Sequence, residues 1–237
     1  MSRLSVNINK IALLRNSRGS NIPDVVQFAK DCERYGAQGI TIHPRPDERH
    51  VRRSDVYALK SAVTTEFNIE GYPTPDFIKM VLEVKPEQCT LVPDEPGQLT
   101  SDHGWDTIKY ASFLTGIVKD LHQAGIRVSL FIDPINTLID GAKATGAERI
   151  EFYTGPFAHD FYIDKETAIR DFRAAAIHCN AIGLGINAGH DLNLDNLKFF
   201  KEQIPQLLEV SIGHTLVKDC LYYGLENTLQ LYRRQLE

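Results

Sequence analysis

The chain has 237 residues, of which 43% are hydrophobic and 24% charged, and its formal net charge at pH 7 is −5. No stretch approaches the roughly 18 consecutive apolar residues that span a membrane, and the acidic balance gives no reason to expect nucleic acid or an anionic membrane as a partner. The length fits one barrel-sized domain of roughly 250 residues. We therefore expect residues 1–237 to form a single domain.

Eight short runs have the composition typical of β-strands. They cover residues 4–9, 39–43, 67–70, 89–93, 127–133, 149–154, 183–189 and 208–213. Stretches with helical periodicity lie between them. Eight strands that alternate with helices predict an α/β fold, a single (β/α)8 TIM barrel with its active site at the carboxyl ends of the strands.

Helices are expected between the strands, at residues 23–35, 55–63, 75–84, 135–144, 164–182 and 193–203. Asp164 and Asn193 are suited to cap the last two. Two connections are longer than a minimal barrel requires, at 44–53 and 94–125, and we expect an extra helix around 105–122 in the second. Residues 214–236 are expected to form a short helix, a break at Gly224 and a closing helix. A short helix after the eighth strand is a recurring phosphate-binding device in this fold.

The cysteines Cys32, Cys89, Cys179 and Cys220 are widely separated and form no CxxC pair. This spacing indicates reduced thiols and favours neither a disulfide frame nor a zinc site. The first residues run directly into the first predicted strand, which leaves no room for a signal peptide. We expect a cytoplasmic protein.

Residues alternate between apolar and polar along several predicted strands. Val6 and Ile8 share one face of the first strand, and Asn7 and Asn9 share the other. The outward face of a barrel packs under helices and must be apolar, so the polar face points inward. An unpaired buried polar group costs about 1–3 kcal/mol, so a polar site in the barrel mouth is the simplest reason for this pattern.

Four residues at the strand ends are the candidate catalytic groups: His43, Glu70, Glu151 and His190. Two imidazoles and two carboxylates around one mouth can give and take protons from several sides of a substrate. The same groups could instead be paired core residues, or could hold a divalent cation. The sequence has no HxxxE-type or HxH spacing that would identify a metal site.

Arginines and glycines near the strand ends suit anionic ligands. Arg15 and Arg18 follow the first strand, and the segment from Arg45 to Arg53 follows the second. Guanidinium groups bind phosphate or carboxylate in a bidentate manner. Gly213-His214 opens the helix after the eighth strand, where backbone N–H groups can bind an anion, and Gly189-His190-Asp191 is similar. Two separate anion sites would indicate two phosphorylated substrates.

A set of motifs follows this order along the chain: Val6-Asn7-Ile8-Asn9, Arg15-Asn16-Ser17-Arg18-Gly19, Gly39-Ile40-Thr41-Ile42-His43-Pro44-Arg45, Asn68-Ile69-Glu70, Leu91-Val92-Pro93, Val128-Ser129-Leu130-Phe131-Ile132-Asp133, Ile150-Glu151, Asn187-Ala188-Gly189-His190 and Ile212-Gly213-His214. Together they resemble the pyridoxine 5′-phosphate synthase family. The match covers essentially the whole chain, and the combination is specific although no single tetrapeptide is.

The resemblance implies that 3-amino-2-oxopropyl phosphate and 1-deoxy-D-xylulose 5-phosphate condense to pyridoxine 5′-phosphate, inorganic phosphate and water, without a metal or a redox cofactor. It implies general bases at His43 and Glu70, a general acid at His190, and stabilisation of transition-state charge by Glu151. It also implies an amino-ketone phosphate site formed by Asn7, Arg18, Gly213 and His214. The deoxyxylulose phosphate site that it implies is formed by Arg45, His50 and Thr100. Extra helices and a homo-octamer are also implied.

The chain departs from the family pattern at two places in the expected substrate-binding region. The family commonly has Asp-His where this chain has Asn9-Lys10, and it often has Gly at the position of Asp191. Lys10 keeps a cation there but shuttles protons less readily than His near neutral pH. A carboxylate at Asp191 would repel phosphate unless its side chain turns away.

Two alternative functions remain. One is a metal-dependent sugar-phosphate isomerase or epimerase on the same barrel, and the other is a non-catalytic phosphometabolite-binding barrel.

Overall fold

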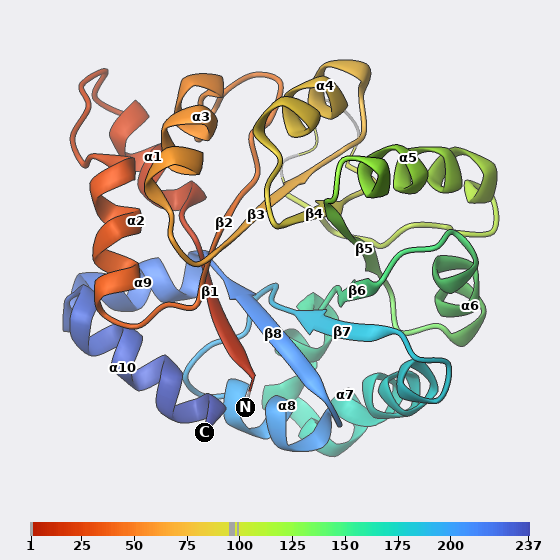
Figure 1. The fold of residues 1–237 in the computed structure, drawn as a ribbon. Coiled ribbons are helices and arrows are strands. Elements are labelled where there is room, and N and C mark those ends of the chain that lie inside the picture. Colours follow the sequence, from red (N-terminus) through yellow and green to blue (C-terminus); the bar gives the residue numbers. More distant parts are fainter. Residues whose placement is uncertain (1, 95–97, 99) are drawn as a thin grey trace.

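The computed structural model describes residues 2–94, 98 and 100–237, and in it eight parallel strands pair in chain order and close into a barrel (Figure 1). The strands are β1 Arg3–Asn7, β2 Gly39–Ile42, β3 Glu66–Gly71, β4 Gln88–Leu91, β5 Arg127–Ile132, β6 Arg149–Phe152, β7 Gly185–Ala188 and β8 Leu207–Ile212. β1 pairs with both β2 and β8, which closes the cylinder. The predicted (β/α)8 TIM barrel is confirmed.

Helices surround the barrel and connect its strands. They are α1 Asn9–Asn16, α2 Val25–Arg34, α3 Arg53–Ala62, α4 Pro75–Val84, α5 Ala111–Gln123, α6 Asn136–Ala144, α7 Gly155–Ala181, α8 Leu197–Gln203, α9 His214–Tyr223 and α10 Leu225–Leu236. The break at Gly224 between α9 and α10 is confirmed, with a φ of +73° that suits glycine. None of the described helices is both long enough and apolar enough to cross a membrane.

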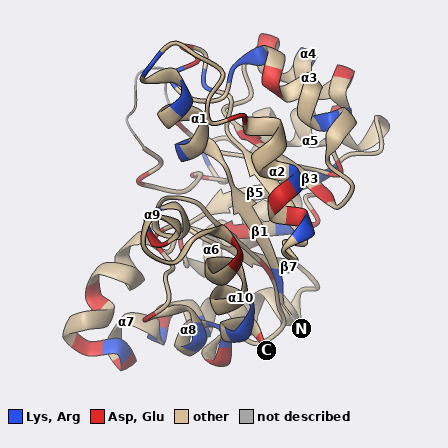
Figure 2. Cartoon of the chain, turned by 90° about the vertical axis from the view of Figure 1, so that its left-hand side faces the viewer, with Lys and Arg blue, Asp and Glu red and all other residues tan. Residues whose placement is uncertain are grey.

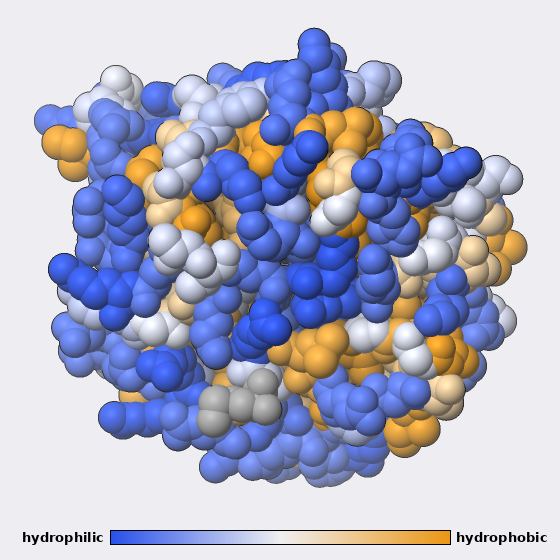
Figure 3. Space-filling model, in the orientation of Figure 1, coloured by the Kyte–Doolittle hydropathy of each residue, from blue (hydrophilic) through white to orange (hydrophobic). Residues whose placement is uncertain are grey.

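The apolar core lies between the sheet and the helices. Outward-facing strand residues such as Val6, Ile40 and Ile69 are fully buried there. Acidic and basic residues are interspersed along the helices that surround the barrel (Figure 2). The face visible in Figure 3 is mostly hydrophilic, with apolar groups in separate patches.

The barrel interior is polar, as the alternation along the strands predicts. In its middle layer the hydroxyls of Ser5 and Thr41 are 2.7 Å apart, and Thr41 accepts a hydrogen bond from Asn68. The Thr90 hydroxyl donates to Oδ1 of the Asn68 side chain at 3.1 Å. These buried groups satisfy one another, which removes most of the desolvation cost of burying them.

Charged side chains fill the layer at the amino ends of the strands. The buried Glu66 carboxylate pairs with Arg3 and Arg127, and Arg149 lies 3.7 Å from it. Glu209 lies beside this group, and burial followed by the charge of Glu66 raises its pKa to about 8. This layer closes the end of the barrel that is opposite the expected active site.

The first strand is shorter than predicted, because it ends at Asn7 rather than at residue 9. The Asn7 side chain accepts a hydrogen bond from the Asn9 backbone N–H at 3.1 Å, and this Asx turn starts the unpredicted helix α1. Ile8 still donates its N–H to the Thr41 carbonyl. Asn9 and Lys10 therefore enter the mouth from the first turn of a helix.

Two predicted helix boundaries are also wrong. The segment expected as an extra helix, 105–122, contains the ordinary barrel helix α5, and its first residue, Trp105, is buried and donates to the Leu91 carbonyl. The helical segments beyond one helix per strand are α1, which precedes α2, and α9, which precedes α10. The part of α7 before Asp164 is a third. Asp164 does cap the second part of α7, where it accepts from the Thr167 N–H and interrupts the helix. The helix expected from residue 193 begins at Leu197.

Candidate active site

A cavity of about 410 Å³ opens at the carboxyl ends of the strands. Its lining includes the four predicted catalytic residues and every predicted substrate-binding residue except Arg18: His43, Glu70, Glu151, His190, Asn7, Asn9, Lys10, Arg45, His50, Thr100, Asp191, Gly213 and His214. Arg18 is exposed in the turn after α1. Its proposed contact with substrate stays a prediction.

Glu70 and Glu151 point into the cavity from β3 and β6, and both are buried. Burial and then the charge of Asp94 raise the pKa of Glu70 to about 8, against the opposing effect of Arg45. Burial and then Glu70 raise the pKa of Glu151 well above its usual value. Glu70 is therefore largely protonated at neutral pH, and the protonated form of Glu151 is favoured in the same direction. Such raised pKa values suit groups that exchange protons with a substrate.

Two buried polar atoms in the cavity wall have no hydrogen-bond partner among the described residues. They are Glu151 Oε2 and Ser211 Oγ. Leaving such an atom unpaired costs about 1–3 kcal/mol, so both are suited to contact a bound molecule.

His43 and His50 lie on the wall formed by β2 and the loop that follows it. Burial and then the charge of Arg45 lower the pKa of His43 well below its usual value, and the same two causes lower that of His50 to about 4. Both imidazoles are thus neutral at pH 7. His50 Nδ1 accepts a hydrogen bond from the Val51 N–H at 3.0 Å, which leaves the proton on Nε2 as a donor.

The end of β1 orients two of the catalytic candidates. The Asn7 amide donates to Glu70 Oε2 at 3.4 Å, and Asn9 Oδ1 accepts from the His43 backbone N–H at 2.9 Å. The departure from Asp to Asn at position 9 thus keeps an acceptor oxygen for the His43 backbone. Lys10 adds a cation beside this pair in the first turn of α1.

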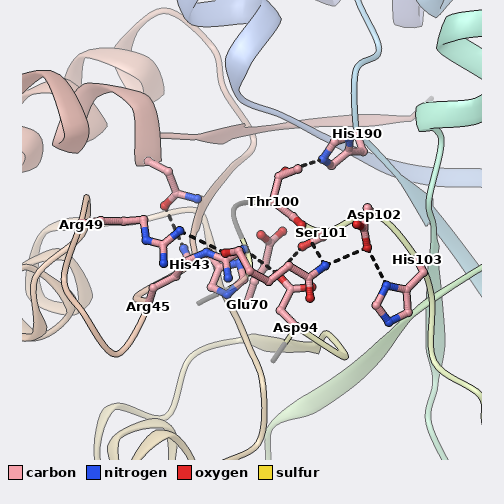
Figure 4. Close-up of polar contacts among 12 residues, drawn as sticks. His43, Arg45, Arg49, Glu70, Asp94, Thr100, Ser101, Asp102, His103 and His190 are labelled. Atoms are coloured by element: carbon pink, nitrogen blue, oxygen red, sulfur yellow. Dashed lines mark hydrogen bonds and ion pairs between the residues drawn. The ribbon is translucent and has the colours of Figure 1, made fainter. Parts of the chain in front are cut away.

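His190 bridges two segments of the mouth. Its Nε2 lies 3.2 Å from Thr100 Oγ1, a contact drawn in Figure 4, and its Nδ1 lies 3.1 Å from Asp191 Oδ2. Its ring also packs edge-on against Tyr153, with centroids 5.3 Å apart. The hydrogen bond to His190 lowers the pKa of Asp191. The Asp191 carboxylate therefore turns toward the imidazole, which accommodates the charge that the family's usual Gly lacks.

The amino end of α9 lies at the cavity and is suited to bind an anion. Its N-cap is Gly213, and a Cβ at that position would lie 3.1 Å from the Asn7 Cβ. At Gly189 a Cβ would lie 2.0 Å from the Ser211 carbonyl oxygen. Glycine at both positions lets β7, β8 and α9 approach closely, and Gly213 and His214 at the start of α9 line the cavity.

The arginines after the first two strands have different roles. Arg45 and Arg49 line the cavity. Arg15 is fully buried and pairs instead with Asp55 at 2.7 Å and with the His50 carbonyl at 3.1 Å. It fixes the loop that carries His50 and is not available to a ligand.

Some cavity residues were not among the predicted site residues: Leu13, Arg49, Val92, Ser101, Phe131, Gly189 and Ser211. The alternation along β5 and β8 could have indicated Phe131 and Ser211, since both share the inward face. Ser101 lies in the long connection after β4, where no periodic signal exists. Among the described residues, no three His, Cys, Asp or Glu side chains are grouped as a metal site requires.

Two solved structures that share this fold have low sequence identity to the chain. A 3-keto-L-gulonate-6-phosphate decarboxylase from Vibrio cholerae matches with a TM-score of 0.67 at 11% identity, covering 99% of this chain and 97% of that one. A thiamine phosphate pyrophosphorylase from Pyrococcus furiosus matches with a TM-score of 0.65 at 10% identity, with coverage of 99% and 95%. At such identities the likeness shows the fold alone.

Comparison of the sequence is far more specific. Proteins named pyridoxine 5′-phosphate synthase are 59% identical in Cytophaga hutchinsonii, over 100% of both chains, and 57% identical in Porphyromonas gingivalis, over 100% of this chain and 99% of that one. The family model described as "Pyridoxal phosphate biosynthesis protein PdxJ" matches residues 4–237. The chain belongs to this family.

Proposed function

We propose that the chain is a pyridoxine 5′-phosphate synthase, which condenses 3-amino-2-oxopropyl phosphate with 1-deoxy-D-xylulose 5-phosphate to pyridoxine 5′-phosphate, phosphate and water. Full-length similarity to relatives of that name supports the reaction. The observation in the structure that supports it best is a single cavity with two protonatable carboxyls and a neutral imidazole. Imine formation, dehydration and loss of phosphate all require such repeated proton transfers.

Each catalytic candidate has a role that fits its environment. His43, being neutral, accepts a proton through its ring nitrogen. Glu70 has a pKa of about 8, so it passes between acid and base near neutral pH and serves as the second base. Burial and then Glu70 raise the pKa of Glu151, and its unpartnered oxygen stabilises charge that develops on the substrate. His190 acts as the general acid at the mouth.

Two anion sites hold the two phosphorylated substrates. The amino end of α9, with Gly213, His214 and Asn7, binds the amino-ketone phosphate. Arg45, Thr100 and neutral His50 bind the deoxyxylulose phosphate, with His50 donating through Nε2. Lys10 and Asp191 lie in the same cavity, and we include Arg18 as a further phosphate ligand on the strength of the family resemblance.

We infer that the enzyme acts in the cytoplasm as a homo-octamer. Large apolar side chains that are 77–79% exposed support self-association: Ile22, Ile163, Leu221 and Tyr222. The mass of the purified protein by light scattering tests the assembly, and a monomeric mass would contradict it.

Mixing both proposed substrates with the enzyme tests the reaction. We expect pyridoxine 5′-phosphate, identified by its absorbance and mass, and release of phosphate. Treatment with a chelator should leave the rate unchanged. Absence of the product at every pH would contradict the assignment, and a chelated enzyme whose activity returned with a divalent cation would favour the metal-dependent isomerase.

A further inference from the structure

Asp94 is a buried carboxylate beside the cavity that has no part in the roles proposed above. It follows β4, and its side chain is 1% exposed. Its Oδ2 accepts hydrogen bonds from Arg45 at 2.5 Å and from the Ser101 hydroxyl at 2.7 Å. Figure 4 shows Asp94, Arg45 and Glu70 grouped at one wall of the site.

The two oxygens of this carboxylate have unequal surroundings. Oδ2 receives both hydrogen bonds, whereas Oδ1 is buried with no partner among the described residues. A charge in such a place is only partly compensated, and it acts at close range on its neighbours because little water screens it. Asp94 also lines a recess of about 120 Å³ beside the cavity.

Glu70 lies close to Asp94 and Arg45 in Figure 4, and after burial itself the charge of Asp94 contributes most to the rise in the pKa of Glu70. Glu70 is also surrounded by other titratable groups on neighbouring strands and loops: His43, Arg45, Cys89, Glu151 and Glu209. Burial raises the pKa of Glu151, Glu209 and Cys89 and lowers that of His43, so each of these groups is shifted toward its uncharged form. After burial, the charges of Asp94 and Arg45 are therefore the main influences on the ionisation of Glu70, and they act in opposite directions.

We propose that Asp94 is a positioning residue whose carboxylate, held by Arg45 and Ser101, opposes the ionisation of Glu70. It keeps Glu70 in its acid form in the free enzyme, so that this side chain can donate a proton before it serves as a base. The catalytic use of Glu70 in this inference rests on the proposed function. The effect of Asp94 on the ionisation of Glu70 does not depend on it.

Isotope-edited infrared titration of enzyme labelled with 13C-glutamate measures the ionisation directly. The protonated carboxyl band that is missing in Glu70→Gln belongs to Glu70. We expect its midpoint near pH 8 in the unmodified protein and at least about one pH unit lower in Asp94→Asn, because Arg45 is then unopposed. Asp94→Ser is a second uncharged variant in case the first folds poorly, and Asp94→Glu should restore the high midpoint.

Asp102→Asn is the matched control, since Asp102 lies in the same connection but its side chain is 63% exposed. It should leave the Glu70 midpoint in place. An unchanged midpoint in both uncharged Asp94 variants, or an equal shift in the Asp102 variant, would overturn the inference. In the pH profile of kcat/KM, the limb that reports Glu70 should move with the infrared midpoint. If the midpoint moves but the enzyme forms no pyridoxine 5′-phosphate, the proposed function fails and the role of Asp94 stands.

Discussion

Replacement of Glu70 with glutamine should make the protein more stable at neutral pH while it removes catalytic turnover. Glu70 is 9% exposed, and its pKa in the folded chain is about 8 against a usual value of 4.5. Above pH 4.5 the unfolded chain releases this proton while the folded chain retains it. Stability therefore falls as the pH rises from 4.5 to 8.

The size of the effect follows from the width of that window. At about 1.4 kcal/mol per pKa unit, the carboxyl lowers the free energy of unfolding by roughly 3 kcal/mol at pH 7. Glutamine keeps an acceptor oxygen for the Asn7 amide and has no proton to lose. For a domain of this size, 3 kcal/mol corresponds to a rise in Tm of about 6–12 °C.

Thermal unfolding of both proteins between pH 4.5 and 8 tests this reasoning. The stability gained by Glu70→Gln should be smallest at pH 4.5 and grow steadily with pH. A gain that is the same at every pH would refute the raised pKa, because it would show that ionisation of the Glu70 carboxyl does not destabilise the folded chain.

Glu87→Gln is a control with the opposite sign. Although burial opposes it, hydrogen bonds from Lys60 and from the Phe67 N–H lower the pKa of Glu87. Its contribution to stability is present above pH 4.5 and lost as the pH falls through its folded pKa. The glutamine variant should thus be less stable than the unmodified protein at pH 7 and converge with it in acid.

Three further predictions concern the site and its support. His190→Ala should lower kcat by on the order of 100-fold or more with little change in KM, and a steady-state result in which KM alone rises would make His190 a binding group. Gly189→Ala should lower the free energy of unfolding by about 1–3 kcal/mol. Gly116→Ala in α5, where a Cβ would have nothing within 4 Å, should raise it by roughly 0.5–1 kcal/mol. Denaturation curves that shift in the same direction for both variants would contradict the close approach at Gly189. Arg15→Leu should reduce stability by about 3–5 kcal/mol, because it leaves Asp55 without its buried partner, and an unchanged denaturation midpoint would refute that role.

The sequence was sufficient to predict the barrel and most of its cavity. Strand alternation is a local property, so the inward position of Glu70 and Glu151 follows from the residues on either side. His43 and Gly213 follow in the same way from the ends of their strands. The closure of the barrel then brings together residues far apart in the chain.

Partners in other loops could not be predicted from local patterns. Arg15 was expected on a ligand-binding loop, but Asp55 and the His50 carbonyl bury it. Asn9 was expected at the end of a strand, but the Asx turn at Asn7 places it in a helix. Both outcomes depend on which polar atoms meet after the loops have folded.

The polarity of the barrel interior has two explanations that the sequence does not separate. Ser5, Thr41, Asn68 and Thr90 are as polar as the site residues, yet they bond to one another and need no ligand. At the mouth, Glu151 retains an unpartnered oxygen although it occupies an equivalent inward position. An inward polar residue therefore indicates a binding site only where the neighbouring strands leave its hydrogen-bonding atoms unpaired.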